Sequence, residues 1–308
     1  MALIQQLALV PDGVNLKMSE LTRVASALSK QVARDFAPIW NTNATVDAFA
    51  SLEDVPSDYW PMIVAADVKG AAGFHDDQDG QPFALIEFGS DWSLTASHEC
   101  LEMLADPFGR RLRAANVPPQ AIKVGLPDRR VRFLVEVCDP SEAGDFAYTV
   151  NGVLVSDFYT PAFFDPIAVS SVRYSFTGAI KAPRTVLKNG YISWNDPVTR
   201  HWMQLRMFPD ELSPKTPHVV DLNTQTSFGK LLAAGSSVRS AVDRVTKTPK
   251  RVQEGGKMMA KATLSAAANS VNEASANCAA MWREQIGRLK SEAGTPAGAP
   301  GGGRKRPR

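Results

Sequence analysis

The sequence predicts an α+β protein with a mixed sheet, a β-rich extension and a helical C-terminal segment. Three observations predict this order. Strand and helix signals alternate over the first 106 residues, β-rich runs with Asn-Gly turns follow, and beyond Phe228 the chain is dominated by Ala, Ser and Lys, with Trp282 as its one aromatic residue. We therefore expect one domain over residues 1–227, with its β-rich extension from about residue 131, and a basic helical segment over residues 228–308 that ends in a disordered tail.

The first half of this domain is expected to contain four strands and two helices. Apolar runs bounded by turn residues predict strands at 3–10, 44–49, 59–66 and 82–88. Apolar residues at three- and four-residue spacing predict a helix over 21–36, with Ser19 as its N-cap. A second helix is expected over 93–104 and ends before Pro107, which cannot continue it. The segment 70–80 is rich in Gly and Asp and is interpreted as a solvated loop that contains His75.

Two Asn-Gly pairs predict hairpins in the β-rich extension. Asn151-Gly152 divides the run 148–155, and Asn189-Gly190 lies between 185–187 and 191–194. Further strands are expected at 131–137 and 201–207. In the basic segment, helices are predicted over 229–246 and roughly 256–290, the second with an apolar stripe of Leu264, Ala267, Val271, Ala274, Cys278 and Met281.

The charge of the chain is divided unequally. The formal net charge is +2, but 15 of the 34 Lys and Arg residues and only 5 of the 32 Asp and Glu residues lie between Lys230 and Arg308. This segment therefore carries a balance of +10, and the rest of the chain carries −8. Such a basic segment predicts weak binding to nucleic acid or to an acidic partner, although its lack of aromatic residues leaves no platform for stacking on bases.

Composition also excludes several classes of protein. No apolar run approaches the roughly 20 residues that span a membrane, so no membrane association is expected. Three cysteines, Cys100, Cys138 and Cys278, do not make a disulfide framework, so we expect buried thiols and a reducing, cytoplasmic compartment. The first residues lack the basic start of a secretory signal and are interpreted as a strand.

The predicted second helix carries the residues on which the functional hypothesis depends. His98 and Glu102 are four residues apart, so on a helix they lie on one face and can reach one metal ion. Glu99 lies beside them, where it can act as the general base toward a water activated by that metal. The pattern is that of the His-Glu-x-x-His metalloprotease helix, with Glu102 in place of the second histidine.

A third metal ligand is expected from the strand end that contains Glu136 and Asp139. Asp106 is excluded because it lies eight residues from His98, about 12 Å along a helix axis, whereas metal–oxygen bonds are about 2 Å. Glu136 is the first choice. Asp139 is the second choice, or an outer partner that orients His98.

Tyr159 is a candidate for a further catalytic role. Its hydroxyl group could donate a hydrogen bond to a tetrahedral oxyanion. The alternative, which the neighbouring Phe158, Phe163 and Phe164 favour, is an aromatic loop that packs into the core.

At these residues the chain resembles the zincin metallopeptidases, in particular the gluzincin arrangement in which a downstream glutamate joins the His-Glu helix. It also resembles uncharacterised zincin-like proteins in which a His-Glu-x-x-Glu helix ending in Asp-Pro is followed by a Glu-x-x-Asp segment. The order of strands and helices over residues 1–106 resembles the zincin N-terminal subdomain, and 82–88 would be the edge strand that borders the substrate cleft. The resemblance implies a zinc-dependent peptidase with His98, Glu102 and Glu136 as ligands and Glu99 as general base.

The departure from the zincin pattern is Glu102. One histidine and two carboxylates leave a bound Zn²⁺ formally neutral, so water should be acidified less than in a shell with two histidines. A slower hydrolase, another divalent cation or a purely structural site are therefore alternatives.

Two functions follow as hypotheses. The first is a zinc-dependent metallohydrolase that acts on a peptide or protein substrate. The second is a non-catalytic zincin-like scaffold, an interaction or structural protein whose basic tail binds nucleic acid or an acidic partner. They differ in geometry, because a metal site requires the carboxylates of Glu102 and Glu136 to converge with His98 around one point with an open side.

Overall fold

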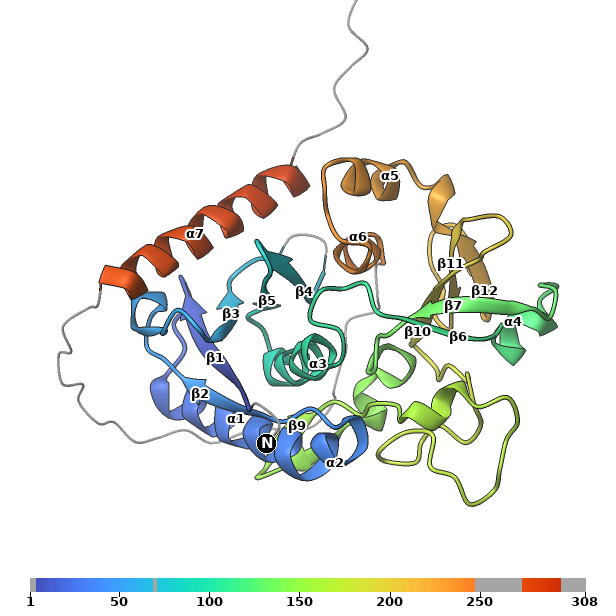
Figure 1. The fold of residues 1–308 in the computed structure, drawn as a ribbon, viewed down its shortest axis with the longest axis horizontal. Helices are drawn as coiled ribbons and strands as arrows, with labels where there is room; N and C mark the ends of the chain where they lie inside the picture. Colours follow the sequence, from blue (N-terminus) through green and yellow to red (C-terminus); the bar gives the residue numbers. More distant parts are fainter. Residues whose placement is uncertain (1–3, 69–70, 247–272, 295–308) are drawn as a thin grey trace, which may run out of the picture.

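The fold consists of two five-stranded sheets with helices packed around and between them, as seen in a computed structural model that describes residues 4–68, 71–246 and 273–294 (Figure 1). The first sheet has the order β2-β1-β3-β5-β4. Four of its strands run parallel, and β4 is antiparallel to β5. The strands are β1 (Gln5–Asp12), β2 (Ala44–Ala48), β3 (Trp60–Ala65), β4 (Gly73–Gln78) and β5 (Gln81–Glu87). The α+β class and the mixed sheet predicted from the sequence are confirmed.

Both faces of this first sheet are buried, which explains why its strands are continuous apolar runs. Leu7, Leu9 and Ile86 belong to the core shared with α1 (Met18–Gln31) and α3 (Trp92–Ala105). The alternate residues, such as Val10 and Phe83, belong to a second core shared with α7 (Glu273–Gly294). Figure 1 shows α7 crossing the side of the sheet away from α3.

The first helical segment is longer than predicted and starts differently. Helix α1 begins at Met18 after Lys17, and no side chain caps it, so the predicted N-cap at Ser19 is wrong. The chain continues through a π-helical turn at Val32–Phe36 into α2 (Ala37–Trp40). It stops at Asn41, which has a left-handed backbone with φ 53°.

The segment predicted as a loop at 70–80 contains a strand. Gly73–Gln78 forms β4, and Asp79 and Gly80, with φ 53° and 84°, make the tight turn into β5. The prediction that 82–88 is the edge strand is therefore wrong. Strand β5 lies between β3 and β4, and the edge strands are β2 and β4.

The second sheet is antiparallel, with the order β12-β11-β10-β7-β6. Its strands are β6 (Leu112–Asn116), β7 (Arg130–Leu134), β10 (Tyr191–Asn195), β11 (Trp202–Arg206) and β12 (His218–Asp221), and the short helix α4 (Pro119–Lys123) connects the first two. A separate hairpin of β8 (Tyr148–Val150) and β9 (Val153–Val155) turns at Asn151-Gly152, as predicted. The second predicted hairpin is wrong, because no strand forms at 185–187 and β10 pairs with β7 and β11 instead.

The described parts of the basic segment pack against the rest of the chain. The predicted helix over 229–246 is two helices, α5 (Thr226–Ala233) and α6 (Val238–Val245), separated at Gly235, which has φ 91°. Among the described side chains of α7, Ala279, Trp282, Gln285, Ile286 and Leu289 are buried. Met281 of the predicted stripe is partly buried against the second core, and the other side chains of that stripe lie outside the described residues. Positions 256–272 of the second predicted helix and positions 295–308 of the predicted disordered tail lie outside the described residues.

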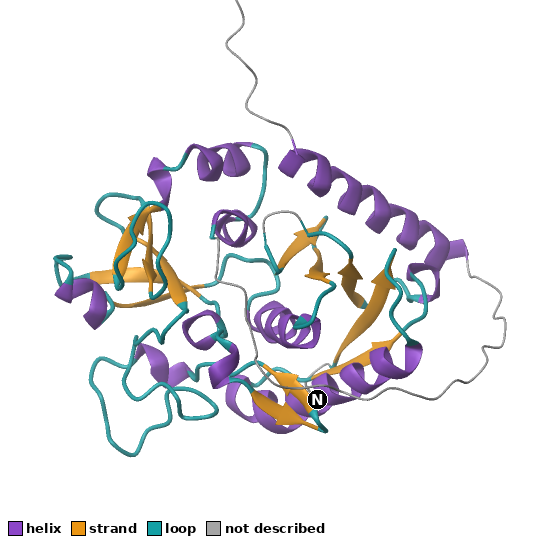
Figure 2. Ribbon diagram, turned by 180° about the vertical axis from the view of Figure 1, so that it is seen from behind, coloured by secondary structure: helices purple, strands orange, loops and turns teal. Residues whose placement is uncertain are grey.

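Figure 2, the view from behind, shows α6 between the two sheets, beside the site described below. Within the described ranges, no helix combines the length and the apolar character needed to cross a membrane.

Candidate metal centre

Helix α3 brings three of the predicted site residues together. Every residue of α3 except Ser93 is buried, so its polar side chains face the protein interior rather than water. His98 Nε2 lies 3.1 Å from Glu102 Oε2, one helical turn away. Glu99 lies next to this pair and is also buried.

A polar network fixes how α3 is rotated about its own axis. The Ser97 hydroxyl donates to Gln31 Oε1 at 2.8 Å and accepts from the backbone N–H of Ser156, also at 2.8 Å. The Gln31 amide in turn donates to the Ser156 carbonyl at 2.9 Å. Helix α1 and the chain after β9 thereby hold Ser97 in place, which fixes the direction of the next residue, His98, about 100° further round the helix.

The chain after β7 supplies the acidic residues that complete the cluster. Strand β7 ends at Leu134, and a 3-10 turn follows at Asp139–Ser141, so the alternation expected of a strand does not reach Glu136 or Asp139. The backbone N–H of Cys138 donates to Glu102 Oε1 at 3.0 Å. Asp139 Oδ1 lies 3.2 Å from His98 Nε2.

Gly190 allows β10 to approach this turn closely. A Cβ atom on Gly190 would lie 2.7 Å from the Asp139 carbonyl oxygen and 2.8 Å from that of Pro140. Both are backbone atoms that cannot rotate away, so only glycine fits here. The Asn189-Gly190 pair that was predicted to form a hairpin instead serves this close contact.

The two candidates for the third ligand occupy different places. Asp139 shares with Glu102 the same ring nitrogen of His98. Glu136 lies with Glu102 and Asp139 within 4.8 Å, and Asp139 also lies within 4.8 Å of His98 and Glu142. The geometry therefore favours Asp139 as the ligand beside His98. A partner that only orients His98 would contact its other ring nitrogen, Nδ1, but the contact of Asp139 is with Nε2.

Two of the three separations between the proposed ligand atoms suit a small divalent cation. Ligands of a tetrahedral zinc ion at bond lengths of about 2.0–2.1 Å lie about 3.3 Å from one another. The separations of 3.1 and 3.2 Å between His98 Nε2 and the two carboxylate oxygens are close to that value. Asp139 Oδ2 is buried and has no hydrogen-bond donor among the described residues.

Electrostatics divides the carboxylates of the cluster. Burial opposes ionisation of Glu102, but the positive charges of Arg239 and His98 outweigh it and hold its pKa well below the usual value. Burial, reinforced by the charges of Glu102 and Asp139, raises the pKa of Glu136 well above its usual value, although Arg239 opposes the shift. Burial and the charge of Glu102 likewise raise the pKa of Asp139. The cluster thus contains more carboxylates than the positively charged side chains facing them can neutralise.

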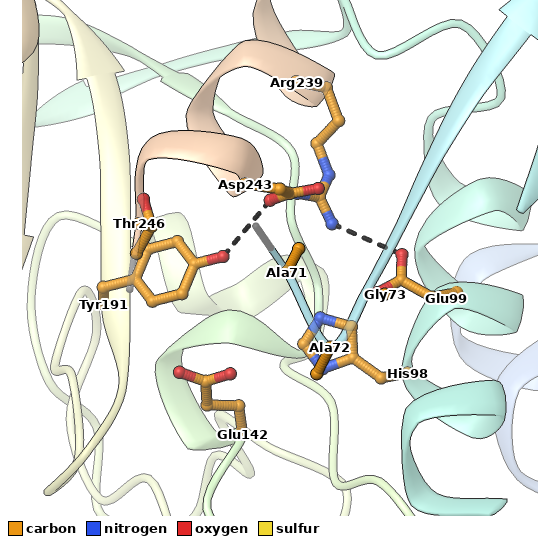
Figure 3. Close-up of a pocket in the computed structure, with 10 residues that line it drawn as sticks. All are labelled: Ala71, Ala72, Gly73, His98, Glu99, Glu142, Tyr191, Arg239, Asp243 and Thr246. Carbon is orange, nitrogen blue, oxygen red and sulfur yellow. Dashed lines mark hydrogen bonds and ion pairs between the residues drawn. The ribbon is translucent and has the colours of Figure 1, made fainter. Parts of the chain in front are cut away.

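Sequence reasoning missed Arg239, a central residue of the cluster. It comes from α6 and is fully buried, and its guanidinium group contacts the carboxylates of Glu102, Glu136 and Asp243. Its Nη2 also lies 3.7 Å from Glu99 Oε2 (Figure 3). A glycine at position 109 makes room for it, because a Cβ there would lie 2.6 Å from the Arg239 Cβ.

A cavity of about 20 Å³ adjoins the cluster, which is room for about one water molecule. His98, Glu99 and Glu142 line it from one side, and Tyr191, Arg239 and Asp243 from the other (Figure 3). Glu142 also forms a compact acidic group with His98 and Asp139. It follows Asp139 by three residues in the sequence.

His75 is a strand residue of β4 that faces the site, not the loop residue that was expected. Its Nε2 lies 2.9 Å from the Asp106 carbonyl oxygen, and its Nδ1 lies 3.5 Å from Glu99 Oε2. It is fully buried. Asp106 itself ends α3, and its carboxylate accepts a hydrogen bond from the backbone N–H of Arg111. Its side chain therefore stabilises the turn that follows α3.

Tyr159 lies in the core near the cluster. Its ring stacks on Phe163 with 4.4 Å between centroids and meets Phe164 edge-on, as the packing alternative predicted. Burial, followed by the charges of Glu136 and Glu102, raises the pKa of its hydroxyl group well above the usual value. Tyr159 is not among the residues that line the cavity.

The thiols and the remaining histidines are less suited to bind a metal. Cys100 and Cys138 are buried and free, and burial raises the pKa of the Cys100 thiol to about 12. Burial and the charge of Glu102 raise the pKa of Cys138 further, so its sulfur stays protonated although it lies within 4.8 Å of His98 and Glu102. His201 contacts Asp221, and His218 contacts Lys215 and Asp210, all in the second sheet and the loop before β12.

Comparisons of this chain with protein-family models, curated proteins and solved structures found no match. The candidate function therefore depends on the geometry described above.

Proposed function

We propose that the protein is a zincin-like metallohydrolase that cleaves peptides, with zinc or another divalent cation held by His98, Glu102 and Asp139. The observation that carries the proposal is the convergence of two carboxylate oxygens on His98 Nε2, at 3.1 and 3.2 Å. The proposal therefore takes Asp139 instead of Glu136 as the third ligand. Glu136 is a partner of Arg239.

The charge of the cluster supports the binding of a cation. Glu99, Glu102, Glu136 and Asp139 are all buried within one small volume, and Arg239 is the one Lys or Arg among the described residues whose side chain contacts them. Burying several carboxylates without matching cations is costly, because each loses its hydration. A divalent ion would offset most of this excess.

The proposed reaction assigns a task to each side chain. A cation bound here would acidify a water molecule and polarise the scissile carbonyl group. Glu99 Oε2 takes the proton of the attacking water and passes it to the leaving amine. His75 Nδ1 lies 3.5 Å from that oxygen and, when it carries a proton, holds the position of the carboxylate.

The edge strand supports a peptide as substrate. Strand β4 borders α3 and pairs with a strand on one side only, so its other edge offers backbone groups to an extended peptide. Gly73, at the start of β4, allows the strand to lie close to Glu99, because a Cβ there would be 2.9 Å from Glu99 Oε1.

Metal analysis of the full-length protein tests the proposal. We expect about one equivalent of zinc in the wild type, and a strong loss in His98→Ala and in Asp139→Ala. Glu99→Gln should keep the metal but lose about 10²–10⁴-fold in hydrolysis of a peptide library. His75→Asn should also keep the metal and hydrolyse more slowly. If the wild type binds no stoichiometric divalent metal, and His98→Ala behaves identically, the proposal is wrong.

The second candidate is a non-catalytic scaffold in which Arg239 is the permanent cation of the cluster. The observation that favours it is that the guanidinium group fills the space between Glu102 and Glu136, and that the cavity beside it holds about one water. This candidate also keeps the proposed weak binding of nucleic acid or an acidic partner through the basic segment. Replacing Arg304, Lys305 and Arg306 by Ala in the full chain should then weaken polyanion binding and flatten its salt dependence.

A further inference from the structure

Helix α6 lies directly over the candidate metal centre. It packs against β4 on one side and against the second sheet on the other (Figures 1 and 3). We propose that α6 is an autoinhibitory segment: Arg239 occupies the metal centre and the helix covers the edge of β4, so the site opens only when α6 withdraws. This inference rests on the proposed metallohydrolase function and concerns the regulation of the same site.

Arg239 and a metal ion would compete for one atom. The Glu102 oxygen that lies 3.1 Å from His98 Nε2 is Oε2, and the same Oε2 contacts Arg239 Nη2. A guanidinium group and a divalent cation on one carboxylate oxygen repel each other strongly in a buried site. The metal therefore binds fully only after Arg239 leaves Oε2, and Glu136 is the carboxylate positioned to keep the guanidinium group.

Substrate and α6 would compete for one surface. An extended peptide has to lie along β4, next to Glu99 and His98, but that place is taken by α6. The cavity that remains has a volume of about 20 Å³, whereas peptide-sized sites need several hundred. In the closed arrangement, water reaches the cluster and a peptide does not.

The contacts that hold α6 closed include one, at Val242, that does not line the cavity. Val242 is fully buried in a small core with residues of the second sheet. Thr246 Oγ1 accepts a hydrogen bond from Gln204 Nε2 at 2.9 Å, and Asp243 Oδ1 accepts one from the Tyr191 hydroxyl at 3.3 Å. Weakening the Val242 contact should therefore favour the open arrangement without changing any ligand.

Two substitutions in the full-length chain, with one control, test the inference. Val242→Ala loosens α6 and leaves Arg239 in place. Arg239→Gln removes the competing charge. Val220→Ala makes the same chemical change in the same small core, but on β12 of the second sheet instead of on α6. Folding of each variant is checked by circular dichroism and by its unfolding midpoint.

The probe for the metal centre is Co²⁺ alone, titrated into metal-free protein and followed by its visible absorption. We expect Val242→Ala and Arg239→Gln to bind Co²⁺ about tenfold more tightly than the wild type, which corresponds to about 1.4 kcal/mol, because the open state is more populated. Val220→Ala should bind like the wild type. In a peptide-library assay, Val242→Ala should gain a similar factor in kcat/KM.

The outcomes separate the inference from the proposed function. Equal Co²⁺ affinity in the wild type, Val242→Ala and Arg239→Gln would overturn the autoinhibitory role and leave the metal centre standing. Equal gains in Val220→Ala and Val242→Ala would overturn it as well, because general loosening would then explain the effect. If no variant binds Co²⁺ at all, both the proposed function and the inference are refuted.

Discussion

Removing the Trp282 side chain tests whether α7 is part of the folded core. Trp282 is 1% exposed, and its ring lies against that of Phe83 with 4.8 Å between centroids. An indole buries about 200 Å², which at about 25 cal/mol/Å² corresponds to about 5 kcal/mol. Its Nε1 has no hydrogen-bond acceptor among the described residues, which offsets about 1–3 kcal/mol of this. We therefore expect Trp282→Ala to lower the free energy of unfolding by about 3 kcal/mol, at the lower end for such substitutions.

Urea unfolding followed by circular dichroism measures this loss in the full-length protein. Trp282→Phe keeps most of the ring and removes the unpaired N–H, so it should cost about 1 kcal/mol or less. Glu284→Ala, on the exposed side of α7, should change the stability by less than about 0.5 kcal/mol. A loss of less than about 1 kcal/mol in Trp282→Ala would refute the packing of α7 on the sheet.

Two further predictions concern the turn at Asp139 and the outer contact of α7. Gly190→Ala should weaken Co²⁺ binding about tenfold or more, because its Cβ would lie 2.7 Å from the Asp139 carbonyl oxygen. Gly229→Ala is the control and should bind Co²⁺ like the wild type, because its Cβ meets nothing within 4 Å. Equal affinities of the two variants in a Co²⁺ titration would contradict this prediction. The hydrogen bond from Arg283 lowers the pKa of Glu53 to about 2. The stabilisation by this exposed pair is therefore present above pH about 4.5 and lost as the pH falls towards 2. It should stay below about 1 kcal/mol, because the pair is exposed to solvent. The free energies of unfolding of the wild type and of Glu53→Gln should thus differ slightly at pH 7 and be equal at pH 2.

The strands and helices of the first half were predictable because their burial follows simple periods. Val10 and Leu9 face opposite cores, and both faces of the sheet are covered, which makes the strand a continuous apolar run. Strand β4 was missed because its sequence, from Gly73 to Gln78, contains two aspartates and a histidine. His75 and Asp76 are buried instead of solvated, and the Asp79-Gly80 turn was the available signal for a hairpin.

The site was predictable where its residues are neighbours on a helix. His98 and Glu102 are related by the helical repeat, so their proximity follows from the sequence. Arg239 is 137 residues from Glu102, and no local pattern indicates a contact across such a distance. The available local signals were a Ser237 N-cap and the spacing of Arg239 and Asp243, which predict a short helix with an internal ion pair but not its location.

The hydrogen bond between His75 and the end of α3 has a consequence for the protons of the site. A carbonyl oxygen can only accept, so the contact of His75 Nε2 with the Asp106 oxygen requires the hydrogen on Nε2. In the neutral ring, Nδ1 then presents a lone pair to Glu99. Two lone pairs repel, so the 3.5 Å contact is attractive only when His75 Nδ1 or Glu99 carries a proton. The last turn of α3 thus fixes the tautomer of a histidine on a different element, and the nitrogen chemical shifts of the His75 ring would report it directly.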